Sequence, residues 1–212
     1  MSRTRIIDCA QVTESLLQEA AQDLAQGALA VLPTDTVYGL GTGAFCEDSI
    51  GQIYALKQRP ATSPLQILTG SLEQARQVAE FSEGALRLAQ TYWPGALTLI
   101  VPPSNEGKSL TRGFAGLGLR VPGNNFLVNL LQRLTGPLAC TSANVHGQPV
   151  LTREEDIIKT FDGKVDFIFL GGTLSPVASS VVDTMKEGRL VREGALSREE
   201  LERVYGAPLQ VN

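Results

Sequence analysis

Three clusters of polar residues, far apart in the sequence, carry the side chains best suited to chemistry. They are residues 33–39 (PTDTVYG), 57–60 (KQRP) and 141–144 (TSAN). Each follows a segment where a strand or helix is expected to end, and α/β proteins bind ligands beyond the carboxyl ends of their strands. Lysine and arginine bind phosphate oxygens, which serine and asparagine can help to orient. The clusters therefore predict a site for a phosphate-bearing ligand, and so a nucleotide enzyme.

The elements that must position these clusters follow from the spacing of apolar residues. Apolar side chains at i, i+3, i+4 and i+7 predict helices, and short apolar runs between turn residues predict strands. Helices are expected along 17–24, after Asp48, after Ser71, over 83–92, along 127–134, after Thr152 and after Ser197. Strands are expected at 28–32, 65–68, 96–101, 116–121, 138–141 and 165–170, then a hairpin of 181–185 with 189–192.

This order of elements predicts the fold class. Strands that alternate with helices and end in a hairpin indicate an α/β domain with a mixed β-sheet flanked by helices. The polar segment 102–113, which contains glycine and proline, is interpreted as a mobile loop. A length of 212 residues suits one domain, and the sequence contains no internal repeat or linker.

Composition excludes several classes of protein. The net charge of −4 argues against a general nucleic-acid-binding protein, which usually carries a basic surface. Cys9, Cys46 and Cys140 are odd in number and show no paired spacing, so they are interpreted as buried free thiols in a reducing compartment. No apolar run approaches the roughly 20 residues of a membrane helix, and no signal peptide is evident. We therefore expect a soluble cytoplasmic protein without a membrane partner.

Each polar cluster has a simpler explanation when it is taken alone. Lys57 continues an apolar helix stripe, and with Arg59 it could merely complement the dipole of a helix C-terminus. Residues 141–144 could form an ordinary turn. Cys140 and His146 suggest a thiol hydrolase, but no acidic residue nearby would orient the histidine. Arg120 and Arg192 each end a predicted strand and could be solvated charges.

Two further phosphate-binding patterns are incomplete. Residues 107–109 (GKS) imitate the end of a P-loop, but the earlier glycine of that motif is Pro102. Residues 39–44 (GLGTGA) match the dinucleotide fingerprint, yet no acidic residue lies about 20 positions further on. A dinucleotide-binding oxidoreductase therefore stays open as an alternative.

Taken together, the motifs resemble those of the YrdC/TsaC family of threonylcarbamoyl-AMP synthases. The resemblance extends from about residue 6 to about residue 196, and its motifs occur in the family's order. They are residues 33–41, 57–60, 93–98, 119–122, 141–144, 179–183 and 191–194. The resemblance implies a single domain over 1–212, with a core of about 6–196 and a C-terminal helix of about 197–206. It also implies a twisted mixed sheet around a deep, positively charged cleft.

The resemblance implies a reaction and a set of site residues. The family joins L-threonine, bicarbonate and ATP into threonylcarbamoyl-AMP and pyrophosphate. Its product passes to partner proteins that modify adenosine 37 of tRNAs reading codons that begin with A. Mg2+ is expected with ATP, without a protein site for the metal. By the same match ATP is bound by Lys57, Arg59, Ser142, Asn144 and Arg192, of which Lys57 and Arg59 are catalytic, and threonine is bound by Thr34, Arg120 and Ser179.

Three positions depart from the family pattern. His146 stands where relatives usually carry serine, Leu68 where many carry histidine, and Ser180 where threonine is usual. The threonine methyl group is expected against Tyr38 or Leu68, although neither assignment follows from a motif. An accessory protein that binds RNA weakly on a basic concave surface stays open as a further alternative, against which the acidic net charge counts.

Overall fold

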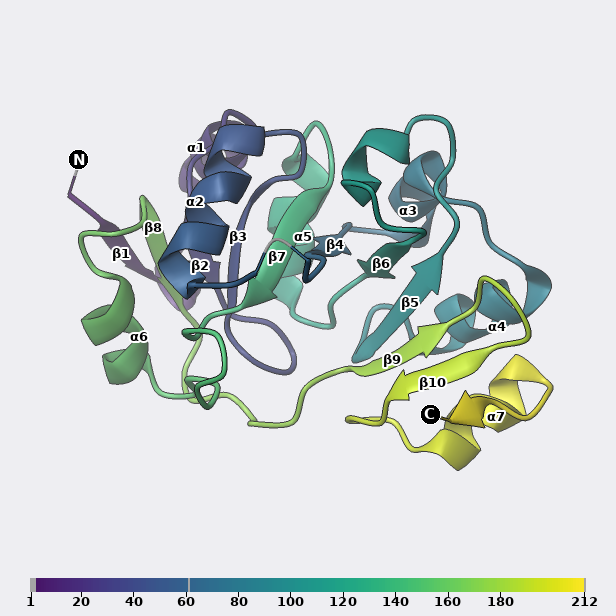
Figure 1. Ribbon diagram of the computed structural model, residues 1–212. Coiled ribbons are helices and arrows are strands. Elements are labelled where there is room, and N and C mark those ends of the chain that lie inside the picture. The colour runs from purple at the N-terminus through teal and green to yellow at the C-terminus, as the bar shows by residue number, and fades with distance from the viewer. Residues whose placement is uncertain (1–2, 61, 212) are drawn as a thin grey trace.

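One mixed sheet of eleven strands organises the part of the chain that the computed structural model describes, residues 3–60 and 62–211 (Figure 1). The predicted domain 1–212 thus includes residues 1, 2, 61 and 212, which lie outside the described residues. The strand order is β1-β8-β2-β3-β7-β4-β6-β5-β9-β10-β11. The strands are β1 (Arg5–Asp8), β2 (Ala30–Leu32), β3 (Gly39–Gly43), β4 (Gln66–Leu68), β5 (Leu97–Val101), β6 (Leu117–Arg120), β7 (Leu138–Ser142), β8 (Phe167–Leu170), β9 (Ser180–Asp183), β10 (Arg189–Arg192) and β11 (Gln210–Val211).

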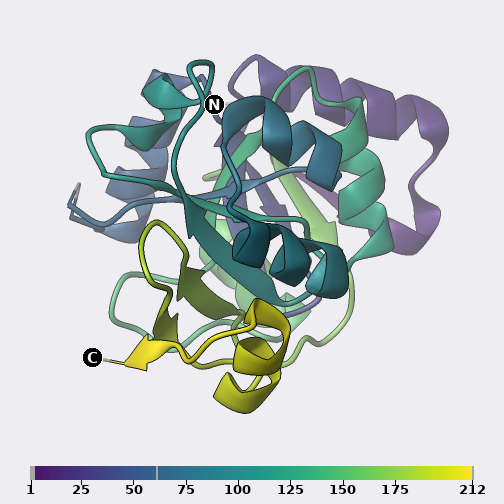
Figure 2. The ribbon, with the colours of Figure 1, turned by 90° about the vertical axis from the view of Figure 1, so that its right-hand side faces the viewer.

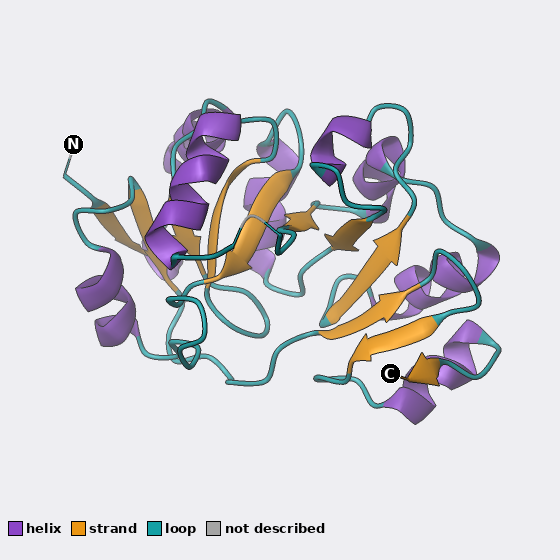
Figure 3. Cartoon of the chain, viewed as in Figure 1, coloured by secondary structure: helices purple, strands orange, loops and turns teal. Residues whose placement is uncertain are grey.

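Helices flank this sheet on both faces (Figure 3). Within the described ranges they are α1 (Glu14–Ala25), α2 (Glu47–Lys57), α3 (Leu72–Val78), α4 (Glu83–Tyr92), α5 (Asn125–Arg133), α6 (Glu154–Phe161) and α7 (Arg198–Tyr205). Two short 3-10 helices cover Cys9–Gln11 and Lys108–Thr111. Parallel pairs such as β4–β6 and antiparallel pairs such as β3–β7 occur in one sheet, so the predicted mixed α/β fold is confirmed.

The two faces of the sheet belong to two separate cores. Successive side chains of a strand point to opposite faces of the sheet. Ile67 therefore lies in the first core, and its neighbour Leu68 lies in the second. Residues of α2, α3, α4, α6 and α7 pack into the first core. Of the α-helices in the described ranges, α1 and α5 pack into the second core, over the half of the sheet that contains β2, β7 and β8. Figure 2 shows α1 and α5 side by side, with α7 against α4 on the other half of the molecule.

Most predicted elements are present, but some helix starts were predicted wrongly. The helix predicted over 83–92 is α4, with the predicted bounds. Asp48 lies in the first turn of α2, whose N-cap is Cys46. Thr152 does not cap α6, because the N-cap position is Arg153. The predicted loop 102–113 contains a 3-10 helix and a bridge between Pro103 and Ala79, so its ends pack on the domain.

The residues that match the dinucleotide fingerprint do not form a phosphate-binding loop. Residues 39–43 form β3, which pairs antiparallel with β2 and β7, whereas the fingerprint requires a turn between a strand and a helix. The glycines allow close packing instead: a Cβ on Gly39 would lie 2.6 Å from Cys140 Sγ, and one on Gly41 would lie 3.0 Å from a side-chain carbon of Leu138. The oxidoreductase alternative therefore loses the motif on which it rested.

The cysteines and the second phosphate pattern also differ from expectation. All three cysteines are free, as predicted, but only Cys140 is buried, while Cys9 and Cys46 are half-buried. In the pattern 107–109, the Lys108 ammonium donates a hydrogen bond of 2.8 Å to Asn105 Oδ1 on the surface. That arrangement lacks the strand and helix that flank a P-loop.

Candidate active site

The second sheet face becomes polar beyond the part that α1 and α5 cover. Gln66, Thr98 and Arg120 lie on β4, β5 and β6, and each alternates with a residue of the first core. Ser179 directly precedes β9 and lies on the same side as Thr98, because its hydroxyl is 2.9 Å from Thr98 Oγ1. We call these four residues the polar strip. It is the part of the sheet on which a site can be built.

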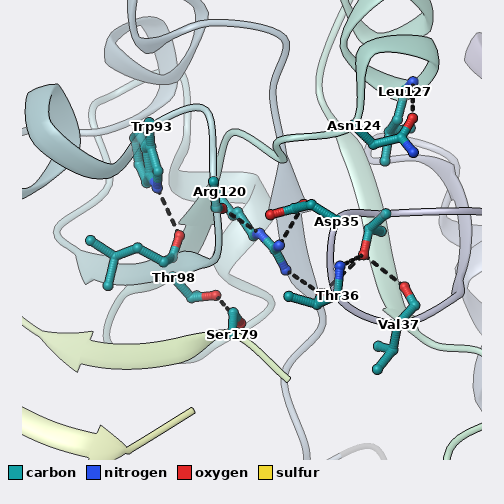
Figure 4. Close-up of polar contacts among 12 residues, drawn as sticks. Asp35, Thr36, Val37, Trp93, Thr98, Arg120, Asn124, Leu127 and Ser179 are labelled. Atoms are coloured by element: carbon teal, nitrogen blue, oxygen red, sulfur yellow. Dashed lines mark hydrogen bonds and ion pairs between the residues drawn. The ribbon is translucent and has the colours of Figure 1, made fainter. Parts of the chain in front are cut away.

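Arg120 is the central cation of this strip, and it is only 3% exposed. Its Nε donates to the carbonyl oxygen of Gly95 at 2.9 Å, its Nη1 to Thr36 Oγ1 at 3.0 Å and its Nη2 to Asp35 Oδ1 at 2.7 Å (Figure 4). Burial lowers the pKa of the guanidinium, and the Asp35 carboxylate opposes that shift. Three fixed acceptors therefore hold the charged end of Arg120 in one orientation.

Thr34 organises the turn that reaches Arg120. Its hydroxyl accepts from the Thr36 N–H at 3.0 Å and donates to the carbonyl oxygen of Val37 at 2.7 Å. It also lies 3.0 Å from Thr36 Oγ1, which in turn accepts from Arg120. Thr34 thus contacts Arg120 through Thr36, and its own hydroxyl is already engaged within the turn.

Ser179 joins Arg192 to the strip. Arg192 Nε donates to the Ser179 carbonyl oxygen at 3.0 Å, and Nη2 donates to its hydroxyl at 3.2 Å. Gln66 Nε2 donates to Thr98 Oγ1, which completes a chain of contacts from Gln66 of β4 through Thr98 and Ser179 to Arg192. Burial, and then the positive charge of Arg120, lower the pKa of Arg192. The two guanidinium groups are therefore neighbours.

Lys57 forms a second group with residues 142–144. Its side chain, 1% exposed, extends from the end of α2 and donates to the carbonyl oxygens of Ser142 and Asn144, the latter at 2.6 Å, and to Asn144 Oδ1 at 3.0 Å. Asn144 Oδ1 also accepts from the Ser142 hydroxyl at 2.6 Å. Burial, and then the charge of Arg59, lower the pKa of Lys57 to about 8. The ammonium is therefore tied to the turn after β7.

Arg59 turns away from this network. Gln58 adopts φ +52°, which ends α2 in a left-handed conformation. The Arg59 guanidinium then donates to the carbonyl oxygens of Ser63 at 3.4 Å and Pro64 at 3.0 Å. It is half-buried, and burial lowers its pKa. These contacts occupy Nε and Nη2, and Nη1 has no hydrogen-bond acceptor within the described part of the chain.

Cys140 is close enough to feel the charges of Arg120 and Lys57. Its buried thiol lies on β7, paired with Gln66 of β4, and both Arg120 and Lys57 are near enough to favour its thiolate. Desolvation outweighs both cations and raises the pKa of Cys140 to about 12. Seven of the eight predicted site residues therefore form three hydrogen-bonded groups, and Arg59 lies outside them. The groups are Thr34 with Arg120 through Thr36, Ser179 with Arg192, and Lys57 with Ser142 and Asn144.

The thiol-hydrolase interpretation is wrong. A thiol with a pKa of about 12 stays protonated at neutral pH and is a poor nucleophile. His146 is exposed, whereas Cys140 is buried, so the imidazole is not placed against the sulfur. The His146 backbone N–H instead donates to the carbonyl oxygen of Lys57 at 2.8 Å.

The structure adds residues to which the sequence analysis assigned no role. Asp35, Thr36 and Thr98 all contact predicted site residues, and all three lie inside motifs that carried the family resemblance. Asp35 could have been identified from the sequence, because it is a charged residue inside such a motif. In contrast, Tyr38 and Leu68 are each 1% exposed and belong to the two cores, and their contact with the threonine methyl group stays a prediction.

The described residues also bear on the predicted cleft, on metal binding and on insertion into a membrane. A hollow of about 600 Å3 lies at the turn between β9 and β10, away from Arg192, so the predicted deep, positively charged cleft stays a prediction. Across residues 3–60 and 62–211, no group of three or more His, Cys, Asp or Glu side chains is placed to hold a metal ion. In the same ranges, no helix combines the length and apolar character needed to cross a membrane.

Comparison with known proteins identifies the family of this chain. A family model named Sua5/YciO/YrdC, described as telomere recombination, matches residues 22–194. The chain belongs to this family. A threonylcarbamoyl-AMP synthase of Pyrococcus abyssi is 37% identical over 200 residues, covering 92% of this chain and 59% of that relative. A putative threonylcarbamoyl-AMP synthase of Mycobacterium leprae is 32% identical over 210 residues, covering 95% of this chain and 94% of that relative.

The structural comparison agrees. The crystal structure of P. abyssi Sua5 complexed with L-threonine matches with a TM-score of 0.89 and 34% identity, covering all of this chain and 63% of that one. The chain thus spans about three fifths of the length of the Sua5 relative that it matches. Family membership confirms the resemblance inferred from the motifs, and the structural match confirms the mixed α/β fold that it implied.

Proposed function

We propose that this chain is an L-threonylcarbamoyladenylate synthase, a nucleotidyltransferase that joins L-threonine, bicarbonate and ATP and releases pyrophosphate. The observation that carries the proposal is that the four predicted cations form two groups, one on the second sheet face and one at the end of α2. Arg120 and Arg192 lie among hydroxyl groups, and Lys57 and Arg59 lie beside the turn after β7. The relatives named threonylcarbamoyl-AMP synthase support the same assignment.

The amino-acid half of the proposed site is centred on Arg120. A guanidinium has five N–H donors, of which Gly95, Thr36 and Asp35 accept three. The remaining donors suit a substrate carboxylate, since a guanidinium binds two carboxylate oxygens in one plane. Ser179 supplies a hydroxyl nearby, and Thr34 acts by holding Thr36 against Arg120.

The nucleotide half of the proposed site is the region of residues 57–59 and 142–144, with Arg192. We assign the direct phosphate contacts to Arg59 and Arg192, which retain donors beyond their present hydrogen bonds. Ser142 and Asn144 would orient the nucleotide from a turn that Lys57 holds in place. Lys57 can contact phosphate itself only if it leaves at least one of its present acceptors.

The proposed chemistry needs charge neutralisation more than a general base. The threonine ammonium group gives up a proton, and bicarbonate takes up a proton and loses water to give CO2. The amine bonds to this CO2 and releases a second proton to solvent, which gives a carbamate, and one carbamate oxygen then forms a bond to the α-phosphorus of ATP. The bond from that phosphorus to the bridging oxygen breaks, and pyrophosphate leaves with the electron pair. Positioning and cations carry most of the catalysis in such transfers. Mg2+ is proposed to arrive on the triphosphate, because phosphate oxygens and water can bind it without a protein ligand set.

The product would be handed to partner proteins. We propose that they attach the threonylcarbamoyl group to adenosine 37 of tRNAs that read codons beginning with A, and that this takes place in the cytoplasm. The alternative role, an accessory protein that binds RNA, is less favoured because the chain carries a net charge of −4.

Release of pyrophosphate tests the proposed function. The reaction should require ATP, threonine and bicarbonate together, because the nucleophile is the carbamate. Release from ATP and threonine in carefully degassed buffer without bicarbonate would indicate direct adenylation of the amino acid instead. No release under any of these conditions would contradict the synthase assignment.

A further inference from the structure

Among the residues that the structure describes, Asp35 is the one carboxylate in contact with the polar strip, and the function proposed above uses it only as an acceptor for Arg120. We propose that Asp35 and Arg120 form a joint recognition site for a zwitterionic amino acid, in which Arg120 binds the carboxylate and Asp35 binds the α-ammonium group. The inference rests on the proposed function, because it concerns how the threonine site selects its substrate. It adds a specificity-determining residue to that site.

The position of Arg120 does not depend on Asp35 alone. The carbonyl oxygen of Gly95 and the hydroxyl of Thr36 accept from two of its nitrogens, at 2.9 and 3.0 Å. These two acceptors come from different segments and already define the plane of the guanidinium. Orientation therefore does not explain why the third acceptor should be a carboxylate.

Asp35 keeps one oxygen available. Its Oδ1 accepts from Arg120 Nη2 at 2.7 Å, whereas Oδ2 has no hydrogen-bond donor among the residues that the structure describes. The Asp35 side chain is 20% exposed and that of Arg120 is 4% exposed, so the carboxylate is the more accessible partner. A Cβ on Gly123 would lie 3.1 Å from Asp35 Oδ2, so the glycine leaves room for this oxygen.

The pair places a negative and a positive group side by side, as Figure 4 shows. A free amino acid presents the opposite arrangement, since its carboxylate and ammonium group are attached to the same carbon. Both of its charges would then be matched, with the ammonium group on Oδ2 and the carboxylate on the remaining donors of Arg120. A carboxylic acid without the amine would bring its negative charge close to the Asp35 carboxylate, and it would have no ammonium group to offset that repulsion.

Substitution of Asp35 by asparagine distinguishes recognition of the ammonium group from orientation of Arg120. Asparagine retains an oxygen that can accept from Arg120, but it removes the negative charge and has nearly the same shape. If Asp35 serves only to orient Arg120, Asp35→Asn should bind threonine as the wild-type protein does. If Asp35 recognises the ammonium group, the variant should bind threonine weakly while its affinity for ATP is retained.

The experiment measures binding by calorimetry on the full chain, with L-threonine and with (R)-3-hydroxybutyrate, which is threonine without its amino group. The wild-type protein should prefer threonine by at least about tenfold, because only threonine offers a cation to Asp35. In Asp35→Asn, threonine affinity should fall by about tenfold or more and the preference should shrink to within about threefold. The matched control is Glu14→Gln, which removes the charge of the exposed carboxylate paired with Arg133 at 2.7 Å and should change neither affinity.

Each outcome is decisive. An unchanged preference in Asp35→Asn overturns the proposed recognition site, whereas a wild-type protein that binds no threonine overturns the proposed function instead. If thermal unfolding shows that Asp35→Asn does not fold, Gly123→Ala replaces it, since the added methyl group presses on Oδ2 and leaves every charge in place. That variant should weaken threonine binding several-fold and leave binding of the hydroxy acid unchanged. Equal effects on both ligands would contradict the inference.

Discussion

Lys57 and Asn144 are joined by two hydrogen bonds, from the ammonium nitrogen to the carbonyl oxygen at 2.6 Å and to Oδ1 at 3.0 Å. The Ser142 carbonyl oxygen accepts a third. An ammonium group has three donors, so all of them are engaged by the turn after β7. Arg59, two residues further on, makes longer contacts and keeps donors for a ligand. The two cations should therefore respond differently to substitution.

Lys57→Ala should affect both stability and turnover. The substitution removes the Lys57 donor from two buried oxygens of Asn144 and from the half-buried Ser142 carbonyl oxygen, which should cost about 1–3 kcal/mol of unfolding free energy. It also loosens the turn that carries Ser142 and Asn144. Thermal unfolding and threonine-dependent pyrophosphate release, measured on the same sample, check this expectation. An unchanged thermal midpoint would show that the turn does not depend on Lys57.

Arg59→Ala should lower turnover without a large loss of stability. A preorganised donor to a charged group in the transition state is typically worth about 3–4 kcal/mol, whereas a half-exposed cation near a helix end contributes at most about 1 kcal/mol to folding. Arg59→Lys should rescue turnover only in part, because an ammonium lacks the planar fork. Lys108→Ala, which removes an exposed cation, is the control. Near-normal turnover in Arg59→Ala would remove Arg59 from the proposed site.

The pH dependence of stability should carry a contribution from Lys57. Burial, and then the charge of Arg59, lower its pKa from 10.5 to about 8. Between these values the unfolded chain binds more protons at this position than the folded chain, so the contribution of Lys57 to stability rises with pH. Below about pH 8 both states are protonated, and the penalty for burying the charge is present in full.

A comparison with Lys57→Met isolates this contribution. From pH 8 to 10.5 the wild-type protein should gain up to about 3 kcal/mol of unfolding free energy relative to the variant, because each pKa unit corresponds to 1.36 kcal/mol. Urea denaturation at a series of pH values provides the measurement. A constant difference between the two proteins would mean that the pKa of Lys57 is not lowered by folding.

Serine should replace threonine poorly, although discrimination should be limited. Tyr38 and Leu68, the residues expected beside the threonine methyl group, are each buried in a core. A difference of one methyl group is typically worth about 1–3 kcal/mol in kcat/KM. Steady-state pyrophosphate release with each amino acid gives the ratio. Discrimination far above this range would require a tighter methyl-binding surface than these residues provide.

Ser180 should contribute to stability through its hydroxyl. This fully buried group donates to the Leu196 carbonyl oxygen at 2.6 Å and accepts from the N–H groups of Gly194 at 2.9 Å and Leu196 at 3.0 Å. Ser180→Ala should cost about 1–3 kcal/mol, because buried polar groups lose their partner. Ser180→Thr retains the hydroxyl and so tests whether the usual family residue is tolerated here. Ser175→Ala, at an exposed position, should change the thermal midpoint little.

The sequence by itself determined the local elements and the family. The helix at Glu83–Tyr92 and the hairpin of β9 and β10 follow from spacing and turn residues within a few positions of one another. The ends of β6 at Arg120 and of β10 at Arg192 were predicted for the same reason. Several short motifs in a fixed order then identified the family, although each alone had a simpler explanation.

Tertiary structure decided how those residues are paired. The ion pair between Asp35 and Arg120 joins positions 85 residues apart, and Lys57 meets its acceptors at a similar separation. Glycines that match a nucleotide-binding loop in the sequence instead form β3, because the antiparallel register with β7 sets their neighbours. Spacing along one chain encodes which face a side chain occupies. It does not encode which strand lies beside it, and that choice determines whether a buried charge meets a ligand, a carboxylate or a backbone carbonyl.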